Sequence, residues 1–314
     1  MAAVAKISVC IPAFKRIEFL QRVLESLAIQ TFRDFEVIVT DDSPDQCVEE
    51  LVSAFENRLP KLIYYRNESP LGTPANWNKA ISMARGEWIK LLHDDDWLAH
   101  PESLEIYAGA AENNPGSFIY SDYIDVFLDS KKEKKRRPSS YRRRQLKKEP
   151  ASILSKNIIG PPSVVLYPND RKHMYDESLK WLVDVDMYIR RLPDSKIFHL
   201  PRPLVKVGVG SDQVTSFTHG VAAVEVPEHL HFIGKLSPKV FNNILVYDYW
   251  WRFTRNFQLS RQEKVSSAAI AWPPVVNRMI RSQARIWPPL LKFGPLSKLL
   301  MAIHFLINRK KMAF

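Results

Sequence analysis

Three consecutive carboxylates, Asp94, Asp95 and Asp96, interrupt an apolar segment that reads WIKLLHDDDWL from Trp88 to Leu98. Adjacent carboxylates repel one another, so such a cluster costs free energy unless a cation lies among them. Mg²⁺ and Mn²⁺ bind one or two carboxylates together with substrate phosphate oxygens. The segment therefore predicts a divalent-metal site for a phosphate-bearing substrate. The alternative is that the three residues only cap the helix predicted after them, because carboxylates favour the positive end of a helix dipole.

The elements that must position these carboxylates follow from two periodicities that alternate in the first hundred residues. Short β-branched or aromatic runs predict strands buried on both faces of a parallel sheet, at residues 7–12, 35–40, 61–65 and 88–92. Apolar stripes at helical spacing predict helices at residues 17–29, 45–56 and 74–84. Strands and helices that alternate over short connections predict βαβ units in an open parallel sheet.

Ligands of such sheets bind beyond the carboxyl ends of the strands. Asp41 and Asp42 follow the second predicted strand, and the acidic segment follows the fourth. We therefore expect the carboxylates of both segments to converge on one edge of the sheet.

The pattern is less regular after residue 114. We expect one or two strands at 117–128, an exposed basic loop at 131–148, a strand at 158–167, a helix at 180–192, proline-interrupted extended chain at 196–208, and helices rich in Trp and Arg beyond 222. The predicted organisation is one domain over residues 1–220, with a nucleotide-binding half at about 1–115 and an acceptor half at about 116–220. Residues 221–314 are predicted to form a helical C-terminal region that associates with a membrane.

Composition and charge narrow the class of protein. The chain has 314 residues with 46% hydrophobic content, which is ample for a globular core. The two cysteines do not suggest a disulfide framework, and the first residues show no basic leader before a long apolar core, so we expect a cytoplasmic location. The apolar run at 299–308 is half of the roughly 20 residues needed to cross a bilayer, so it could lie on a membrane without spanning it.

The formal net charge of +11 is concentrated in residues 131–148, where eleven Lys or Arg accompany one Glu. Basic surface of this density attracts the phosphates of nucleic acid, nucleotides or anionic lipid headgroups. The simplest interpretation is a solvated loop. A functional loop would hold a lipid-linked pyrophosphate or an anionic bilayer surface, together with an amphipathic C-terminus at 290–307.

Four segments, ISVCIPAFKR, EVIVTDDSPD, LGTPANWNKAISMARGEWIKLLHDDDWL and WLVDVDMYIRR, together resemble the inverting family 2 glycosyltransferases of GT-A fold in their order and spacing. The resemblance covers about residues 5–215. It implies a Rossmann-like, mostly parallel α/β sheet flanked by helices, with a helical C-terminal extension. It also implies transfer of a hexosyl group from a nucleoside diphosphate sugar, a UDP sugar in our expectation, to a hydroxyl of a glycan or lipid-linked glycan, with Mn²⁺ or Mg²⁺, as in cell-surface polysaccharide synthesis.

The resemblance also assigns residues to a nucleotide site and a metal site. The nucleotide site would contain Pro12, Ala13, Phe14, Asp41, Asp42, Gly72, Asn76 and Asp94. Asp95 and Asp96 would bind the metal. His93 stands where the family has the first Asp of its L-D-x-D-D segment.

An inverting transferase needs a base that takes the proton of the acceptor hydroxyl on the face of the sugar opposite the leaving diphosphate. The family's E-D pair corresponds to Val183 and Asp184 here, so Asp184 is the implied base, and Asp186 is a structural or acceptor-side partner. The alternative is that both residues only charge the start of a helix. In the loop after this helix, Ser211 and Gln213 would approach the diphosphate, or the loop is an ordinary one.

Two other functions remain open at this point. A nucleic-acid-binding protein would use the basic loop, but no RNP-type segment, zinc-ligand spacing or helix-turn-helix pattern is visible. A nucleotidyltransferase would carry a glycine-rich, basic loop after the first strand, where PAFKR stands instead. The expected partners are therefore a nucleoside diphosphate sugar, a glycan or lipid-linked acceptor and an anionic membrane surface, and not a nucleic acid.

Overall fold

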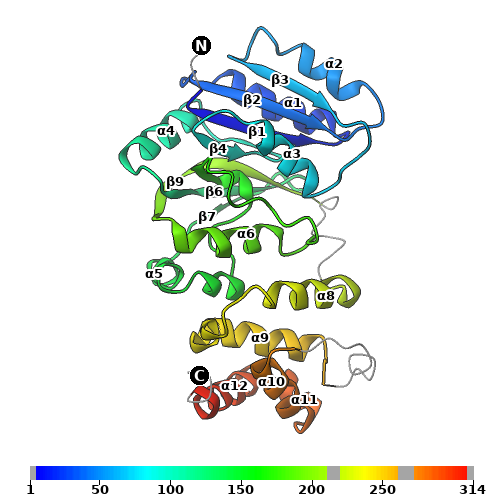
Figure 1. The fold of residues 1–314 in the computed structure, drawn as a ribbon, viewed down its shortest axis with the longest axis vertical. Coiled ribbons are helices and arrows are strands. Elements are labelled where there is room, and N and C mark those ends of the chain that lie inside the picture. Colours follow the sequence, from blue (N-terminus) through cyan, green and yellow to red (C-terminus); the bar gives the residue numbers. More distant parts are fainter. Residues whose placement is uncertain (1–4, 211–219, 261–271, 310–314) are drawn as a thin grey trace. The chain divides into compact units, whose positions relative to one another are not determined.

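The computed structural model describes residues 5–210, 220–260 and 272–309 (Figure 1). The chain divides into two compact units. The first consists of Met1–Arg142 and Ile158–Ser216, and the second of Arg143–Asn157 and Phe217–Phe314. Residues 143–157 thus group with the C-terminal helices, whereas the domain boundary at residue 220 stays a prediction.

The first unit is built on a curled, mixed sheet. Within the described residues nine strands form it, in the order β3-β2-β1-β4-β8-β6-β9-β5, with β7 paired to β6. The neighbouring pairs β1–β2, β2–β3, β1–β4 and β6–β9 are parallel. The strands are β1 Ile7–Ala13, β2 Phe35–Asp41, β3 Leu62–Arg66, β4 Trp88–Leu91, β5 Asp96–Leu98, β6 Phe118–Phe127, β7 Glu133–Arg136, β8 Val165–Pro168 and β9 Ile197–Val209.

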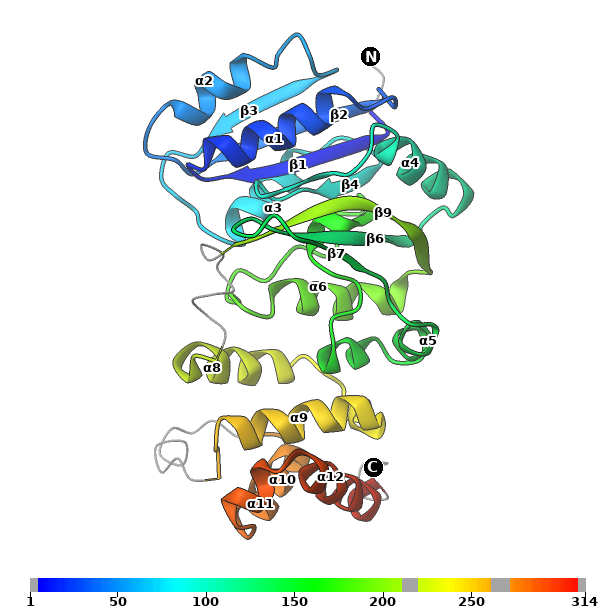
Figure 2. The same ribbon diagram turned by 180° about the vertical axis from the view of Figure 1, so that it is seen from behind.

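Helices cover both faces of this sheet. Figures 1 and 2 view the molecule from opposite sides, and α3 lies in front of the sheet in one view whereas α1 lies in front of it in the other. The helical elements of this unit are α1 Ile17–Ala28, α2 Cys47–Ser53, α3 Ala75–Met83, α4 Ser103–Asn113, η2 Pro162–Val164, α6 Val183–Arg191 and η3 Leu192–Asp194. The predicted strands and helices of the first hundred residues are confirmed, because apolar stripes such as Leu20, Val23, Leu24 and Leu27 of α1 are buried as their spacing predicts.

The basic segment 131–148 is largely exposed, as predicted, but the prediction that it forms a loop is wrong. Its first part forms β7, which pairs antiparallel with β6, and its second part forms helix α5, Ser140–Lys148. The repulsion between its like charges is offset by carboxylates on β6: Arg136 lies 2.5 Å from Asp125, and Arg137 lies 3.8 Å from Asp122. These carboxylates come from the preceding strand, so the composition of the basic run alone did not reveal them.

Strand β9 is continuous, although prolines were expected to interrupt it. Its pairing with β6 shifts register between Ser121 and Tyr123, opposite the segment that contains Pro201 and Pro203. A bulge accommodates prolines because residues in it need not donate a ladder hydrogen bond.

The second unit is helical, as predicted for the residues beyond 222. Its core contains the fully buried rings of Tyr247, Trp250 and Trp251, which come from one helix. No helix in the described part of the chain is long and apolar enough to cross a membrane. The elements of this unit are η1 Pro150–Ser155, α8 Ala222–Ile233, η4 Pro238–Asn242, α9 Ile244–Asn256, α10 Pro274–Ala284, α11 Pro288–Lys292 and α12 Gly294–Arg309, with the C-terminal part of α5.

Candidate functional site

The acidic segment lies in the turn between β4, which ends at Leu91, and β5, which begins at Asp96. Asp94, Asp95 and Asp96 are only 6%, 8% and 1% exposed. Helix α4 begins at Ser103, so the alternative that these carboxylates cap a helix is wrong. The cluster is buried at the carboxyl end of a strand, where the sequence predicted a ligand site.

Arg16 supplies a positive charge to this cluster. Its guanidinium lies 2.7 Å from the Asp94 carboxylate and 3.2 Å from that of Asp95. The tight turn after β1 directs it there, with Lys15 in the left-handed region at φ 63°. Burial nevertheless raises the pKa of Asp94 to about 7, against the opposing charge of Arg16. Sequence reasoning missed this residue, although the basic pair that follows PAF was the available signal.

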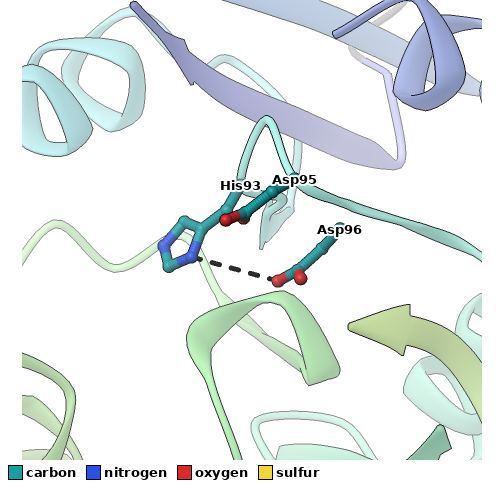
Figure 3. Close-up of side chains that lie close together, drawn as sticks. All are labelled: His93, Asp95 and Asp96. Carbon is teal, nitrogen blue, oxygen red and sulfur yellow. Dashed lines mark ion pairs between the residues drawn. The ribbon is translucent and has the colours of Figure 1, made fainter. Parts of the chain in front are cut away.

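His93, Asp95 and Asp96 form a candidate metal site (Figure 3). One ligand atom from each lies within 4.8 Å of the others. His93 Nδ1 is 3.9 Å from an Asp96 oxygen. Burial lowers the pKa of His93 to about 4, so its imidazole is neutral at pH 7 and has a lone pair to offer. One nitrogen and two carboxylates fit a divalent transition metal.

Strand β9 closes the site from the other side. The Gly208 amide donates to Asp96 Oδ1 at 3.1 Å. A Cβ on Gly208 would lie 2.4 Å from the Asp95 carbonyl oxygen, so no side chain fits there. Burial, and next the charge of Asp95, raise the pKa of Asp96 well above its usual range. A cation would therefore stabilise the ionised form of Asp96.

The two carboxylates at the end of β2, Asp41 and Asp42, hold loops of the protein. Asp41 is fully buried and accepts hydrogen bonds from the Ser43 amide at 2.8 Å and the Tyr64 hydroxyl at 2.9 Å. Asp42 accepts hydrogen bonds from the amides of Leu71 at 3.0 Å and Gly72 at 2.8 Å. Asp42 and Gly72 are therefore brought together as the nucleotide-site prediction requires, whereas both Asp41 oxygens already have protein partners.

The other residues assigned to the nucleotide differ in how much surface they offer. Asn76 is buried, donates to the Thr40 carbonyl at 3.1 Å and accepts from Asn67 at 3.0 Å, so its amide ties the ends of the strands together. Pro12 and Ala13 are buried in β1, whereas Phe14 is 48% exposed. Phe14 thus presents an exposed aromatic ring beside these buried residues. Asn67, which also binds Asp42, was missed because its partners are distant in sequence.

The two carboxylates of α6 have different surroundings. Asp186 is fully buried and bonded 2.7 Å from Arg190 one turn later, which makes it structural. Asp184 lies in the first turn, is partly exposed, and accepts a hydrogen bond from the Val185 amide at 2.8 Å. Tyr123 connects this helix with the acidic segment electrostatically: its pKa is raised to about 12 by burial, by Asp125, and by both Asp96 and Asp184. Ser211 and Gln213 lie outside the described residues.

Comparisons with known proteins show the family of this chain. The profile of the family described as Glycosyl transferase family 2 matches residues 8–165. An uncharacterised glycosyltransferase of Methanocaldococcus jannaschii is 29% identical over 187 residues, which cover 58% of this chain and 63% of the relative. A Campylobacter jejuni GalNAc(5)-diNAcBac-PP-undecaprenol beta-1,3-glucosyltransferase is 32% identical over 94 residues, which cover 30% of each chain. The chain thus spans less than two thirds of the length of these curated relatives.

Two solved structures share the fold. Staphylococcus aureus TarS 1–349 in complex with UDP-GlcNAc superposes with a TM-score of 0.63 at 19% identity, covering 98% of this chain and 90% of the TarS 1–349 chain. A Pyrobaculum calidifontis mannosyltransferase in complex with GDP-Man and Mn²⁺ gives 0.55 at 14% identity, covering 98% and 88%. The predicted GT-A type fold is therefore confirmed.

Proposed function

This chain belongs to glycosyl transferase family 2, and from that premise we propose that it is a metal-dependent, inverting hexosyltransferase. The donor is a nucleoside diphosphate sugar, with a UDP sugar as the first candidate, and the acceptor is a hydroxyl of a glycan or lipid-linked glycan. The observation that carries the proposal is the group His93, Asp95 and Asp96, whose ligand atoms lie within 4.8 Å of one another at the end of β4. The TarS complex with UDP-GlcNAc supports the donor class.

The nucleotide binds along the ends of β1 and β2. Phe14 offers an exposed ring to the base, and Asp42 holds the Leu71–Gly72 backbone in position beside it. Asp94 lies by the ribose or the sugar, where its bond to Arg16 keeps its carboxylate oriented. Glycine at position 72 has φ 72° and allows the backbone to approach the ligand closely.

Asp95 and Asp96, together with His93, would hold the Mn²⁺ or Mg²⁺ ion. When bound, the ion neutralises charge that develops on the leaving diphosphate. Arg16, which lies 3.2 Å from Asp95, limits the repulsion between the carboxylates and keeps the segment folded while the donor enters.

Asp184 takes the proton of the acceptor hydroxyl as that oxygen attacks the sugar. Its position supports this role, because it lies in the first turn of α6 and is partly exposed, whereas Asp186 is fully buried and bound to Arg190. A base on a helix start is held in place by the backbone, which favours proton transfer in one geometry.

We further propose that the acceptor is presented at the cytoplasmic face of an anionic membrane. The Campylobacter relative, a glucosyltransferase named for an undecaprenol-linked substrate, supports a lipid-linked acceptor. The basic β7–α5 segment supports the proposal that this membrane is anionic, because each lysine or arginine near an anionic leaflet contributes about 1 kcal/mol to binding.

The metal assignment is tested with Asp95→Ala. We expect wild-type protein to bind UDP more tightly with Mn²⁺ than without it, and the variant to lose that difference and the metal-dependent hydrolysis of donor. Isothermal titration with UDP measures the binding, and an assay of nucleotide release from a panel of nucleotide sugars measures the hydrolysis. Asp129→Ala, which removes an exposed carboxylate of the same unit, is the control. Metal-independent UDP binding in the wild type would contradict the proposal.

A further inference from the structure

Helix α12, Gly294–Arg309, is apolar on two opposite sides. Its inner side contains Met301 and Phe305, each 6% exposed, which pack into the second unit. Its outer side contains Leu299, Ile303, Leu306 and Ile307, which are 46–66% exposed. These four residues are spaced by three or four positions, so they form one continuous stripe on the helix surface. We name it the outer stripe.

The outer stripe is not an isolated apolar surface. Trp287, Leu290 and Phe293, on and beside α11, are 66%, 45% and 61% exposed. An apolar helix face is normally buried against protein or lipid, and large exposed apolar surfaces mark binding sites. The concentration of seven such side chains in residues 287–307 therefore indicates a partner that removes them from water.

The charge of the same segment identifies the class of that partner. Residues 272–314 contain eight Lys or Arg and no Asp or Glu. Arg281, Arg285, Lys292 and Lys298 are exposed. A second copy of this segment would bring like charges together, and a partner protein would need an acidic surface around an apolar one. An anionic bilayer offers both properties, because its headgroups are negative and its acyl boundary is apolar.

We infer that the outer stripe, with Trp287 and Phe293, is the surface by which the protein lies on an anionic bilayer. Helix α12 lies in the plane of the interface, with the stripe at the acyl boundary and the basic side chains at the headgroups. The helix does not span, since none in the described part of the chain is long and apolar enough. The inference rests on the proposal that the acceptor is presented at a membrane, but its test does not depend on transfer.

The experiment is sedimentation with vesicles of phosphatidylcholine alone or with phosphatidylglycerol. We expect wild-type protein to bind the anionic vesicles. The double variant Ile303→Ser/Leu306→Ser should bind them at least about tenfold more weakly. The substituted side chains are 46% and 65% exposed, so the fold should be retained. The matched control is Ile29→Ser/Ile244→Ser, which replaces side chains that are 59% and 43% exposed elsewhere, and it should bind as the wild type does.

Two further measurements separate the apolar and the charged contributions. Brominated lipids should quench the fluorescence of wild-type protein more than that of Trp287→Phe, because the indole enters the interface. Lys292→Ser/Lys298→Ser should lose part of the preference for anionic over neutral vesicles.

Equal binding of the stripe variant and its control would overturn the inference. So would sedimentation velocity showing that the stripe variant loses self-association while its vesicle binding is unchanged, since the stripe would then contact a second copy. Metal-dependent donor hydrolysis without vesicles should be the same in the stripe variant and the wild type. If the wild-type protein binds vesicles but hydrolyses no donor, the proposed transferase function would be contradicted and the inference about the outer stripe would stand.

Discussion

Asp184 and Asp186 are two positions apart, yet they have different surroundings in the structure. Asp186 is fully buried against Arg190, and Asp184 is partly exposed. A carboxylate that must meet an acceptor hydroxyl needs access, whereas a buried, paired one contributes to stability. This difference favours Asp184 as the base on structural grounds that the sequence motif did not contain.

We predict that Asp184→Asn lowers the transfer rate by roughly 10² to 10⁴ while donor binding and the unfolding midpoint stay near those of the wild type. Asp186→Asn should instead lower the unfolding midpoint, because it leaves the Arg190 guanidinium without its charged partner. Steady-state kinetics and thermal unfolding of both variants check this. An active Asp184→Asn enzyme, with Asp186→Asn folded but inactive, would reverse the assignment.

His93 would give the candidate metal site one nitrogen ligand beside the two carboxylates. Imidazole suits transition metals, whereas Mg²⁺ prefers oxygen ligands. We predict that wild-type protein binds Mn²⁺ more tightly than Mg²⁺ in the presence of UDP, and that His93→Asp lowers the ratio of the two affinities. Isothermal titration with each metal measures the ratio of the two affinities. An unchanged ratio would exclude His93 as a ligand.

At the scale of the elements, the close approach of β9 to the acidic turn is what holds the site together. Gly208 leaves no room for a Cβ, which would lie 2.4 Å from the Asp95 carbonyl oxygen, and its amide binds Asp96. The strand therefore fixes the backbone and one carboxylate of the segment at the same time.

We predict that Gly208→Ala lowers the free energy of unfolding by about 1–3 kcal/mol and weakens metal-dependent UDP binding, since the acidic turn must move. Gly109→Ala is the matched control: it lies inside α4 with nothing within 4 Å of the new Cβ. This second change should raise stability by roughly 0.5–1 kcal/mol, because alanine restricts the unfolded chain. Denaturant unfolding and UDP titration of both variants provide the comparison.

At the scale of the whole molecule, the two units differ in what supports them. The first is organised by a sheet with buried carboxylates, and the second by a cluster of aromatic rings around His229. His229 is fully buried, lies 4.0 Å from the ring of Phe253, donates from Nδ1 to the Glu225 carbonyl at 2.6 Å, and accepts from the Tyr249 hydroxyl. Burial lowers its pKa to about 4.

This pKa makes the second unit sensitive to acid. The unfolded chain binds a proton at about pH 6.5 and the folded one only near pH 4, so stability is complete above 6.5 and falls as the pH drops between these values. We predict a loss on the order of 3 kcal/mol at pH 4. Hydrogen exchange of α8 and α9 peptides measures it, and His229→Gln should flatten the dependence. His231→Gln, on the exposed side of the same helix, should leave it unchanged.

The sequence by itself determined the first four strands, the helices between them, and the position of the acidic segment beyond the end of β4. These features follow from local periodicity, because apolar residues at period two or 3.6 require a buried face whatever the rest of the chain does. The identity of the transferase family also followed from four local segments, and the family match to residues 8–165 confirms it.

The tertiary structure decided which groups meet. Arg16 pairs with Asp94 from 78 positions away, Asp42 holds Gly72 from 30 positions away, and Gly208 binds Asp96 from 112 positions away. Periodicity carries no information about such pairs, because each depends on which strands become neighbours and in which register. The same reason explains the first part of the basic segment at 131–148. Its charges predicted a loop, but residues 133–136 form β7, where β6 places the Asp125 carboxylate beside Arg136.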